Sequence, residues 1–318
     1  MRAKRSRGKR AVSRYGEFER RVAAACPTLQ QPNDIRELCI MIYFETGSRI
    51  DRLVSDMRRH FKTQGRAHLP WRRTRDPYKV LVSEVMLQQT QVERVIPFYK
   101  NFLREFPNAQ RLSEAELSRV LTAWQGLGYN RRAKYLHGAA KEVVEKWHGK
   151  FPRTAAEIES LPGVGPYTAR AVAAFAFNSP EVFIETNIRT VFLQHCFASR
   201  RTKVSDKEIL LLVAEAFKRS KMEPREFYAA LMDYGAHLKR SGMKLNAKSK
   251  HYAKQSKFEG SARQLRGHIL KLLLQKPHTE RSLVQQTGRS SADVRAALAD
   301  LQKEKMITKQ GSLFIIAA

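Results

Sequence analysis

The apolar residues of this chain recur at helical spacing, and no alternating strand pattern of any length precedes residue 300. Val92, Val95, Tyr99 and Phe102 show the period, which places apolar side chains on one face of a helix. Strands would instead need an alternation of apolar and polar residues. We therefore predict an all-helical domain of about 200 residues, beginning near Ser48.

Capping residues mark where several helices start. Asp76 followed by Pro77 predicts an N-cap with proline at the first helical position. A serine or threonine with glutamate three residues later predicts a capping box, in which each side chain bonds the backbone of the other residue. The sequence contains such pairs at Thr90 with Glu93, Ser113 with Glu116, and Thr154 with Glu157.

The last segment has a different pattern. Residues 265–274 and 279–286 read as two helices, and Ser290 or Ser291 caps a third. Residues 306–309 and 313–316 then read as a short β-hairpin. Three helices and a hairpin indicate a winged helix, whose third helix, with Arg289 and Arg295, would enter a DNA major groove. A small packing or protein-docking domain is an equally open interpretation.

The charge balance narrows the class of partner. The 318 residues include 59 Lys and Arg against 30 Asp and Glu, a formal net charge of +29. Nucleic acid is the first candidate for so basic a chain, and an anionic membrane surface the second. No apolar run is long enough to span a bilayer, and the charged first residues argue against a secretory signal. We expect a monomer in the cytoplasm, associated with the nucleoid of a bacterium.

Residues 1–47 are predicted to form a basic, poorly ordered extension. Seven Arg or Lys and no acid lie within residues 2–14, which favours a solvated tail with a loose grip on phosphates. The three cysteines, Cys26, Cys39 and Cys196, are far apart and lack metal-type spacing. They indicate free thiols in a reducing compartment.

The strongest local motif is Leu161-Pro-Gly-Val-Gly-Pro-Tyr-Thr-Ala169. It predicts a helix ending near Leu161, a tight glycine turn, and a helix starting at Pro166. Gly163, Val164 and Gly165 would present backbone amides beside the positive end of the helix dipole, which is a phosphate site that needs no charged side chain. An ordinary helix–turn–helix has the same appearance, so the motif by itself indicates DNA contact and not catalysis.

This hairpin, with a carboxylate, Glu185, eighteen residues after Tyr167, resembles the helix-hairpin-helix (HhH-GPD) DNA glycosylases. Four further stretches resemble the MutY-type adenine glycosylases of that superfamily, in the right order over about residues 50–240. They are Leu69-Pro-Trp-Arg72, Ser83-Glu-Val-Met-Leu-Gln-Gln-Thr90, Gly126-Leu-Gly-Tyr129 and Leu231-Met-Asp-Tyr-Gly-Ala236. The resemblance implies an all-α glycosylase fold of two helical lobes with a cleft between them, which the winged helix extends.

The resemblance also implies roles. Adenine leaves poorly unless its ring is protonated, and a carboxyl kept neutral by burial can supply that proton. Glu84 follows the apolar run Val80-Leu-Val82, and the resemblance makes it the acid that protonates N7 of adenine. Trp71 and Arg72 would hold the base. A solvated helix glutamate is the alternative for Glu84.

Positive charge grows on the sugar as the base leaves, and a second carboxylate can stabilise it. Glu185 occupies that position, where the family usually has aspartate; a helix-cap carboxylate is the alternative. Asn187 would orient the sugar or a water. Tyr167 stands where strand-cleaving members use a Schiff-base lysine, so we expect a monofunctional enzyme. Its hydroxyl would bond Glu185.

The target base must be flipped out of the stack, and the gap must be filled. Gln88, Gln89 and Tyr129 match the family residues that do so, with Tyr129 as the flat wedge. A core tyrosine is the alternative for Tyr129. The family often has a second aromatic next to it, where this chain has Asn130.

Two family features are missing. The usual iron–sulfur cluster needs four cysteines, but the matching positions are Lys239, Asn246, Ser249 and Gln255. We therefore expect no metal cofactor, with a monovalent cation at the hairpin as the one ion left open. The basic segment 239–257 would grip phosphates instead. The large C-terminal domain that reads 8-oxoguanine is replaced by about sixty residues, so preference for that base is not supported by the sequence.

These interpretations give predicted domains at residues 1–47, 48–258 (glycosylase) and 259–318 (winged helix). The first functional hypothesis is excision of adenine opposite guanine or 8-oxoguanine in duplex DNA that carries a mismatch or lesion. The second is excision of thymine or uracil opposite guanine by the same fold. The third is a non-catalytic DNA-binding protein.

Overall fold

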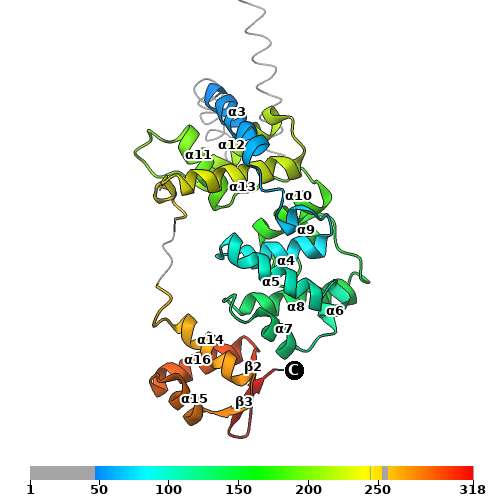
Figure 1. Ribbon diagram of the computed structural model, residues 1–318, viewed down its shortest axis with the longest axis vertical. Coiled ribbons are helices and arrows are strands. Elements are labelled where there is room, and N and C mark those ends of the chain that lie inside the picture. Colours follow the sequence, from blue (N-terminus) through cyan, green and yellow to red (C-terminus); the bar gives the residue numbers. More distant parts are fainter. Residues whose placement is uncertain (1–46, 244, 253–256, 318) are drawn as a thin grey trace, which may run out of the picture. The chain divides into compact units, whose positions relative to one another are not determined.

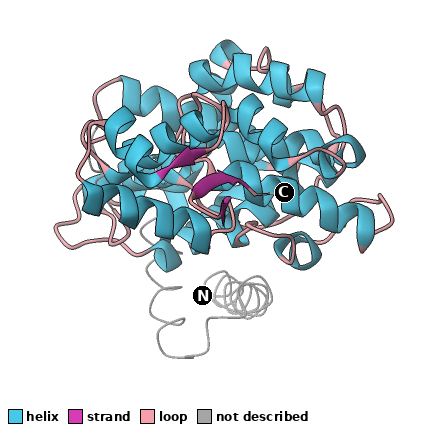
Figure 2. Cartoon of the chain, turned by 90° about the horizontal axis from the view of Figure 1, so that it is seen from below, coloured by secondary structure: helices cyan, strands magenta, loops and turns pink. Residues whose placement is uncertain are grey.

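A computed structural model describes residues 47–243, 245–252 and 257–317. The predicted extension before Gly47, with Cys26 and Cys39, lies outside the described residues. Within them the chain is a series of helices, and the strands of its one sheet all lie between residues 278 and 316 (Figures 1 and 2). The all-helical prediction with a small winged helix is therefore confirmed. None of the described helices is long and apolar enough to cross a lipid bilayer.

The chain divides into two compact units, residues 1–66 with 180–253 and residues 67–179 with 254–318. The predicted domain boundaries follow the chain instead of these units, and they stay a prediction. Each unit is described by itself below.

The described part of the first unit is entirely helical. Its apolar core joins Ile50, Leu53, Phe192 and Phe227, all fully buried. The elements are α3 (Gly47–Gln64), α11 (Thr186–Cys196), α12 (Asp206–Ser220), α13 (Pro224–Arg240) and η2 (Leu245–Lys248).

The stretch Leu231-Met-Asp-Tyr-Gly-Ala236, which lies in α13, holds the structure of the first unit together. Asp233, 1% exposed, accepts bonds from the backbone nitrogen and Nε of Arg66 at 2.9 and 2.8 Å. Gly235 faces the first turn of α11, where a Cβ would lie 2.2 Å from the backbone oxygen of Asn187. A residue without a side chain is therefore required for α13 to pass so close to the turn that carries Glu185 and Asn187.

Three histidines and a tyrosine meet where α3, α11 and α13 pack together. The rings of His60 and His237 are 4.6 Å apart, and His195 Nε2 lies 3.0 Å from the Tyr234 hydroxyl. Burial lowers the pKa of His60, and the neighbouring His237 lowers it further. Burial also lowers the pKa of His195. The neutral forms of His60 and His195 are thus favoured inside this helix junction.

The second unit is built around two nearly enclosed helices, α4 and α10. Every residue from Val80 to Met86 is buried, and α10 presents small residues such as Ala171 and Ala173 to its neighbours. These helices pack on one another, and α9 precedes α10 as the first arm of the hairpin. The elements are η1 (Pro70–Arg72), α4 (Pro77–Leu87), α5 (Val92–Glu105), α6 (Ala109–Ser113), α7 (Leu117–Trp124), α8 (Arg131–Glu145), α9 (Ala155–Glu159) and α10 (Pro166–Phe177).

Of the four helix starts predicted between residues 76 and 157, two are confirmed and two are wrong. Asp76 accepts bonds from the first turn of α4, and Thr154 forms a complete capping box with Glu157, as predicted. The Thr90 box is wrong, because its hydroxyl donates to the Gln88 carbonyl and α5 starts after Gln91. The Ser113 box is also wrong, because Ser113 ends α6 and donates back to Gln110.

A buried guanidinium joins α4 to the loop before α8. Arg132 Nη1 donates to the carbonyls of Val85, Met86 and Gln88 at 2.8, 2.9 and 2.7 Å. Its Nη2 donates to the Gly128 carbonyl at 3.0 Å and to Thr90 Oγ1 at 3.3 Å. Burial lowers the pKa of Arg132 to about 10. Backbone carbonyls thus hold this cation, and it fixes the end of α4 against residues 125–130.

The winged helix also belongs to the second unit and matches its sequence prediction. Gly288 ends the second helix in the left-handed region, and Ser290 caps the third, as expected. Strand β3 lies between β1 and β2 in an antiparallel sheet, so a short strand joins the predicted hairpin. Arg295 pairs with Glu280 at 2.9 Å, and Arg289 with Asp293 at 3.6 Å. The elements are α14 (Ala262–Leu273), β1 (His278–Thr279), α15 (Glu280–Thr287), α16 (Ser291–Lys303), β2 (Ile307–Gln310) and β3 (Leu313–Ile316).

Replacing Gly235 by alanine should force α13 away from α11. Overpacking of this kind costs roughly 1–3 kcal/mol, so we expect a lower midpoint of thermal unfolding for Gly235→Ala. The same change at Gly267 in α14, where nothing lies within 4 Å of an added Cβ, should instead raise stability slightly. Thermal unfolding followed by circular dichroism checks both. Equal midpoints for the two variants would contradict the close approach.

Replacing Arg132 by methionine should leave four backbone carbonyls without their donor. Removing one partner of a buried polar network costs about 3–5 kcal/mol, so we expect severe destabilisation in urea unfolding. Arg131→Met is the matched control, because the Arg131 side chain is 56% exposed and its change should cost less than about 1 kcal/mol. Similar unfolding curves for both variants would show that Arg132 does not hold the structure together.

Acidification should destabilise the histidine junction. The pKa of His60 is lowered in the folded state, so the unfolded chain binds more protons as the pH falls through the ordinary histidine range near 6.5. The stabilisation that comes from keeping His60 neutral is complete above that range and is lost as the pH falls below it. Urea unfolding at pH 7.5 and pH 5.5 measures the loss, which should be smaller in His60→Phe. An equal loss in both proteins would remove His60 as a cause.

Candidate active site

Glu84 lies inside the second unit and has a hydroxyl partner. The packing of α4 on α10 buries it to 6% exposure and places Tyr167, in the first turn of α10, beside it. The Tyr167 hydroxyl donates a hydrogen bond of 2.9 Å to Glu84 Oε2. The expected bond from Tyr167 to Glu185 is therefore corrected, because the α4–α10 contact gives this hydroxyl to Glu84. A buried carboxyl with a fixed orientation is suited to proton transfer.

Glu185 is the N-cap residue of α11 in the first unit. Its Oε1 accepts bonds from the backbone nitrogens of Asn187 and Ile188 at 2.7 and 2.9 Å. The Asn187 side-chain amide approaches Oε2 at 3.4 Å, so the structure brings these two predicted residues together. Burial lowers the pKa of Lys239 on α13, and the charge of Glu185 opposes that shift. Glu185 therefore does cap α11. The two backbone amides bond Oε1, and the Asn187 side chain approaches Oε2.

The hairpin between α9 and α10 has the tight turn that the glycines predict. Gly163 has φ of 72°, and a Cβ there would lie 2.4 Å from Tyr135 Cβ. Val164 is buried, and its amide donates to the Leu161 carbonyl at 3.1 Å. Gly165 caps α10, is exposed, and has nothing within 4 Å of an added Cβ. A ligand can therefore approach the backbone at Gly165 closely.

The 3-10 helix η1 carries the predicted base-binding pair. Trp71 is 7% exposed and meets Tyr99 edge-on, with ring centroids 5.4 Å apart. Arg72 is half-buried, and its guanidinium carbon lies 5.8 Å from the centre of the Phe175 ring. Trp71 therefore packs into the core, and Arg72 is the member of the pair with a partly open side chain.

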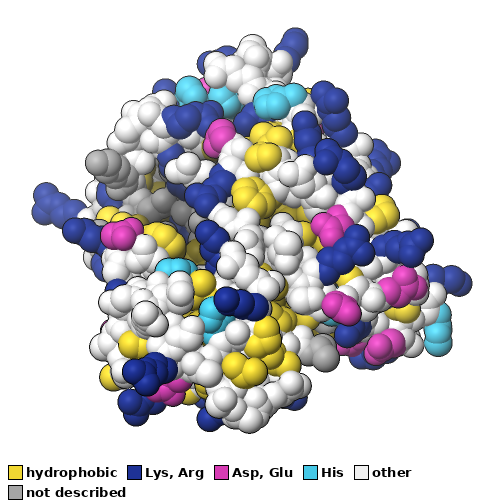
Figure 3. Space-filling view, turned by 60° about the horizontal axis from the view of Figure 1, so that its bottom comes forward, with side chains coloured by type: hydrophobic (Ala, Val, Ile, Leu, Met, Phe, Trp, Pro, Cys, Tyr) yellow, Lys and Arg dark blue, Asp and Glu magenta, His cyan; other side chains and the backbone are white. Residues whose placement is uncertain are grey.

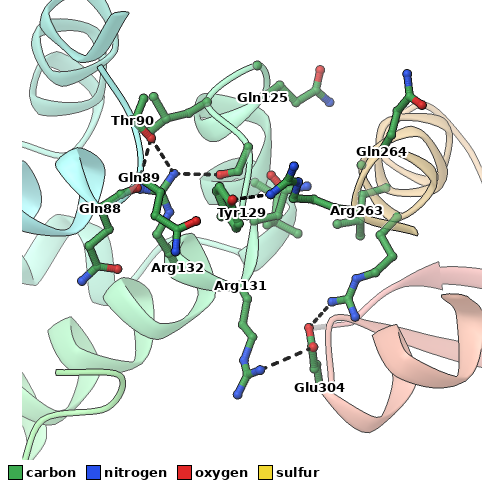
Figure 4. Close-up of a pocket in the computed structure, with 18 of the residues that line it drawn as sticks. Gln88, Gln89, Thr90, Gln125, Tyr129, Arg131, Arg132, Arg263, Gln264 and Glu304 are labelled. Carbon is green, nitrogen blue, oxygen red and sulfur yellow. Dashed lines mark hydrogen bonds and ion pairs between the residues drawn. The ribbon is translucent and has the colours of Figure 1, made fainter. Parts of the chain in front are cut away.

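The three predicted wedge residues line one cavity of about 1780 Å³, together with Gly163 and Val164 (Figure 4). Gln89 and Tyr129 have backbone φ angles of 54° and 51°, a region that residues other than glycine seldom adopt. Gln88 donates to Thr168 Oγ1 at 3.3 Å. Strained backbone of this kind persists where the surrounding structure fixes it, and it gathers at functional sites.

The positions that would hold a metal cluster contact the chain's own atoms. Asn246 Oδ1 accepts a bond of 3.0 Å from Thr190, and Ser249 Oγ accepts one of 3.0 Å from the backbone nitrogen of His251. Gln255 lies outside the described residues. Across the part of the chain that the structure describes, no three His, Cys, Asp or Glu side chains are grouped to hold a metal ion.

Sequence reasoning missed two arginines of this site. Arg132 bonds the Gly128 carbonyl next to Tyr129, and its guanidinium carbon lies 5.4 Å from the centre of the tyrosine ring. Arg263 of α14 lies 5.0 Å from the same ring and donates to its hydroxyl. Nothing in a basic chain distinguishes these two from its other arginines.

Comparisons with known proteins agree with this geometry. Residues 82–217 match the HhH-GPD superfamily base excision DNA repair protein family. The adenine DNA glycosylase of Buchnera aphidicola subsp. Baizongia pistaciae (strain Bp) is 40% identical over 172 residues, which are 54% of this chain and 48% of that protein. The adenine DNA glycosylase of Mycolicibacterium smegmatis is 39% identical over 172 residues, 54% of this chain and 58% of that protein. The chain thus spans about half the length of the curated relatives it matches.

A solved structure agrees on the fold. The structure of a thermostable thymine-DNA glycosylase superposes with a TM-score of 0.51 at 25% identity, covering 65% of this chain and 98% of that one. The predicted family is confirmed by these matches. Residues 82–217 of this chain are thus similar to the HhH-GPD superfamily of base excision DNA repair proteins.

Proposed function

We propose that this protein is a monofunctional DNA N-glycosylase that removes a mispaired adenine from duplex DNA. The observation that carries the proposal is the buried Glu84 carboxyl, oriented by the Tyr167 hydroxyl, within the region that matches a base-excision family. The relatives at 39–40% identity are named adenine DNA glycosylases, which favours adenine as the base.

Glu84 is the proton donor of the proposed reaction. The Tyr167 hydroxyl donates to Oε2 and so fixes the orientation of the carboxyl that carries the proton toward the base. Transfer of that proton to N7 of adenine turns a poor leaving group into a neutral one. The bond between base and sugar then breaks with its electron pair on the adenine. Arg72, half-buried and beside Phe175, is the proposed partner for the edge of the ring.

Glu185 is the proposed stabiliser of the sugar cation. Two backbone amides hold its Oε1 at the start of α11. A negative charge opposes the positive charge that grows on the sugar as the base departs. Water then adds to the anomeric carbon and loses a proton to the solvent, from which Glu84 regains the proton that it gave to the base. Asn187 is the residue proposed to orient this water. The extra methylene of glutamate, compared with the family's aspartate, fits a side chain that bends back onto its own helix.

Tyr167 supports an intact product strand. A Schiff base needs an amine, and the phenol in the first turn of α10 cannot form one. Its bond to Glu84 also gives this hydroxyl a different task, which is to hold the acid. We therefore propose an abasic site as the product, without cleavage of the backbone.

The DNA is proposed to bind through the hairpin backbone and the wedge residues. Gly165 opens the start of α10 to a phosphate, and Gln88, Gln89 and Tyr129 fill the gap left by the flipped base. Figure 3 shows Lys and Arg side chains spread over the face it presents, in keeping with the net charge of +29. The proposal includes a monomer at the bacterial nucleoid that works without a metal cofactor, with a monovalent cation at the hairpin as the one candidate ion.

A second candidate is excision of thymine opposite guanine. It is favoured by the structural match to a protein named thymine-DNA glycosylase, of which this chain covers 98%. A pyrimidine gains less from protonation than a purine does, so a buried acid at Glu84 favours adenine.

The base specificity can be measured directly. Duplexes with A opposite G, A opposite 8-oxoguanine, T opposite G and U opposite G are incubated with the protein and then treated with alkali, which breaks abasic strands. We expect breaks in the adenine strand alone, and none before alkali. Glu84→Gln should slow them by at least about 10³-fold, because general acid catalysis contributes factors of this size. Glu93→Gln, an exposed helix glutamate, is the matched control and should keep full activity.

Each other outcome has a definite meaning. Breaks at thymine or uracil alone would replace adenine by the second candidate. Breaks before alkali would contradict the monofunctional assignment. A protein that binds every duplex and cuts none would be a DNA-binding protein without catalysis.

A further inference from the structure

The cavity that holds the wedge residues has a second wall. One side is formed by Gln88, Gln89 and Tyr129, and the other by residues 258–271, the start of the winged helix (Figure 4). Lys134 of α8 donates to the Glu304 carbonyl and Arg131 pairs with the Glu304 carboxylate at 3.8 Å, so contacts within this unit connect the two walls. The wedge therefore faces the winged helix across a space large enough for nucleotides.

One winged-helix side chain reaches the wedge itself. The Arg263 guanidinium donates to the Tyr129 hydroxyl and lies 5.0 Å from the centre of its ring. Phe258 covers the same guanidinium from another direction at 5.5 Å. Figure 4 shows Arg263 and Tyr129 pointing toward one another. The Arg263 guanidinium therefore lies next to any ligand that the Tyr129 ring contacts.

Three polar residues that also line the cavity have partners of their own. Gln264 accepts a bond of 2.7 Å from the Gly260 amide and donates to Glu259 at 3.0 Å, so it braces the turn before α14. Arg266 pairs with Asp300 and Glu304 of α16. Arg289 donates to the Gly260 carbonyl at 3.0 Å. Arg263 differs from these three residues because it contacts the Tyr129 ring and hydroxyl.

We propose that Arg263 is a specificity-determining residue that reads the base left opposite the excised one, and that it selects guanine. The proposal rests on the proposed function, because it requires Tyr129 to enter a duplex. When the tyrosine takes the place of the flipped base, Arg263 arrives beside the base that has lost its partner. The rigid fork of a guanidinium fits the O6 and N7 acceptors of guanine, whereas cytosine offers an amino donor that repels it.

The chemistry of the fork makes this testable apart from charge. A lysine at position 263 keeps the positive charge and any phosphate contact, but it loses the two-pronged geometry. A preference for guanine that rests on the fork is therefore lost in Arg263→Lys as well as in Arg263→Ala. A contact with phosphate would survive in the lysine variant. Arg281→Ala is the matched control, because Arg281 lies exposed on α15 and does not line the cavity.

Binding is the readout, so the test does not depend on catalysis. Duplexes carry a tetrahydrofuran abasic analogue opposite guanine, 8-oxoguanine or cytosine, and dissociation constants are measured by fluorescence anisotropy at one fixed salt concentration. The wild type and Arg281→Ala should prefer guanine over cytosine by roughly tenfold, the value of one good bidentate contact. Arg263→Ala and Arg263→Lys should bind both with nearly equal affinity. Thermal unfolding checks that each variant is folded. If Arg263→Ala does not fold, Arg263→Lys alone is compared with the wild type.

Three results would overturn the proposal. Arg263→Ala weakening all duplexes equally, with rescue by lysine, would make Arg263 a phosphate contact. Arg263→Ala strengthening all duplexes equally would make it a latch that restrains Tyr129. A wild type without any preference for the opposite base would show that nothing reads it. None of these results changes the adenine-excision assay, so a failure of this proposal and a failure of the proposed function are told apart.

Discussion

The guanidinium of Arg132 is the constraint on which the wedge side of the site depends. It is buried and satisfied by carbonyls from the end of α4 and from the loop before α8, where a carboxylate would be the usual partner. Two segments far apart in sequence are therefore tied to one cation. The strained backbone at Gln89 and Tyr129 lies on either side of it, and the strain is sustained because the guanidinium fixes the neighbouring carbonyls.

The two carboxylates of the proposed reaction owe their properties to different local structures. Glu84 is enclosed by the packing of small residues on α10 against α4 and is oriented by a phenol. Glu185 instead faces the amides of its own helix, and the absent side chain of Gly235 sets how closely that turn packs. Glu84 is thus held inside the protein by helix packing, whereas Glu185 is held by the backbone amides of its own helix. The acid and the cation stabiliser of one reaction can thus be built from the same residue type.

Local signals predicted much of this structure, and contacts between distant segments did not. The Asp76 cap, the Thr154 box, the glycine hairpin and the Leu313–Ile316 strand each depend on residues within a few positions. The boxes expected at Thr90 and Ser113 failed because those hydroxyls bond preceding carbonyls. The Tyr167 bond to Glu84 spans 83 positions, and the Arg263 bond to Tyr129 spans 134. Such pairings follow from helix packing, and a single sequence carries no mark of them.

The central claim is that Glu84 gives a proton to N7 of the departing adenine. The most direct measurement replaces that nitrogen by carbon and compares single-turnover release of 7-deazaadenine and adenine from otherwise identical duplexes opposite guanine. The account predicts equal binding of the two duplexes, with adenine released and 7-deazaadenine retained over the same time. Release of both bases at similar rates would contradict it, because the bond would then break without a proton at N7.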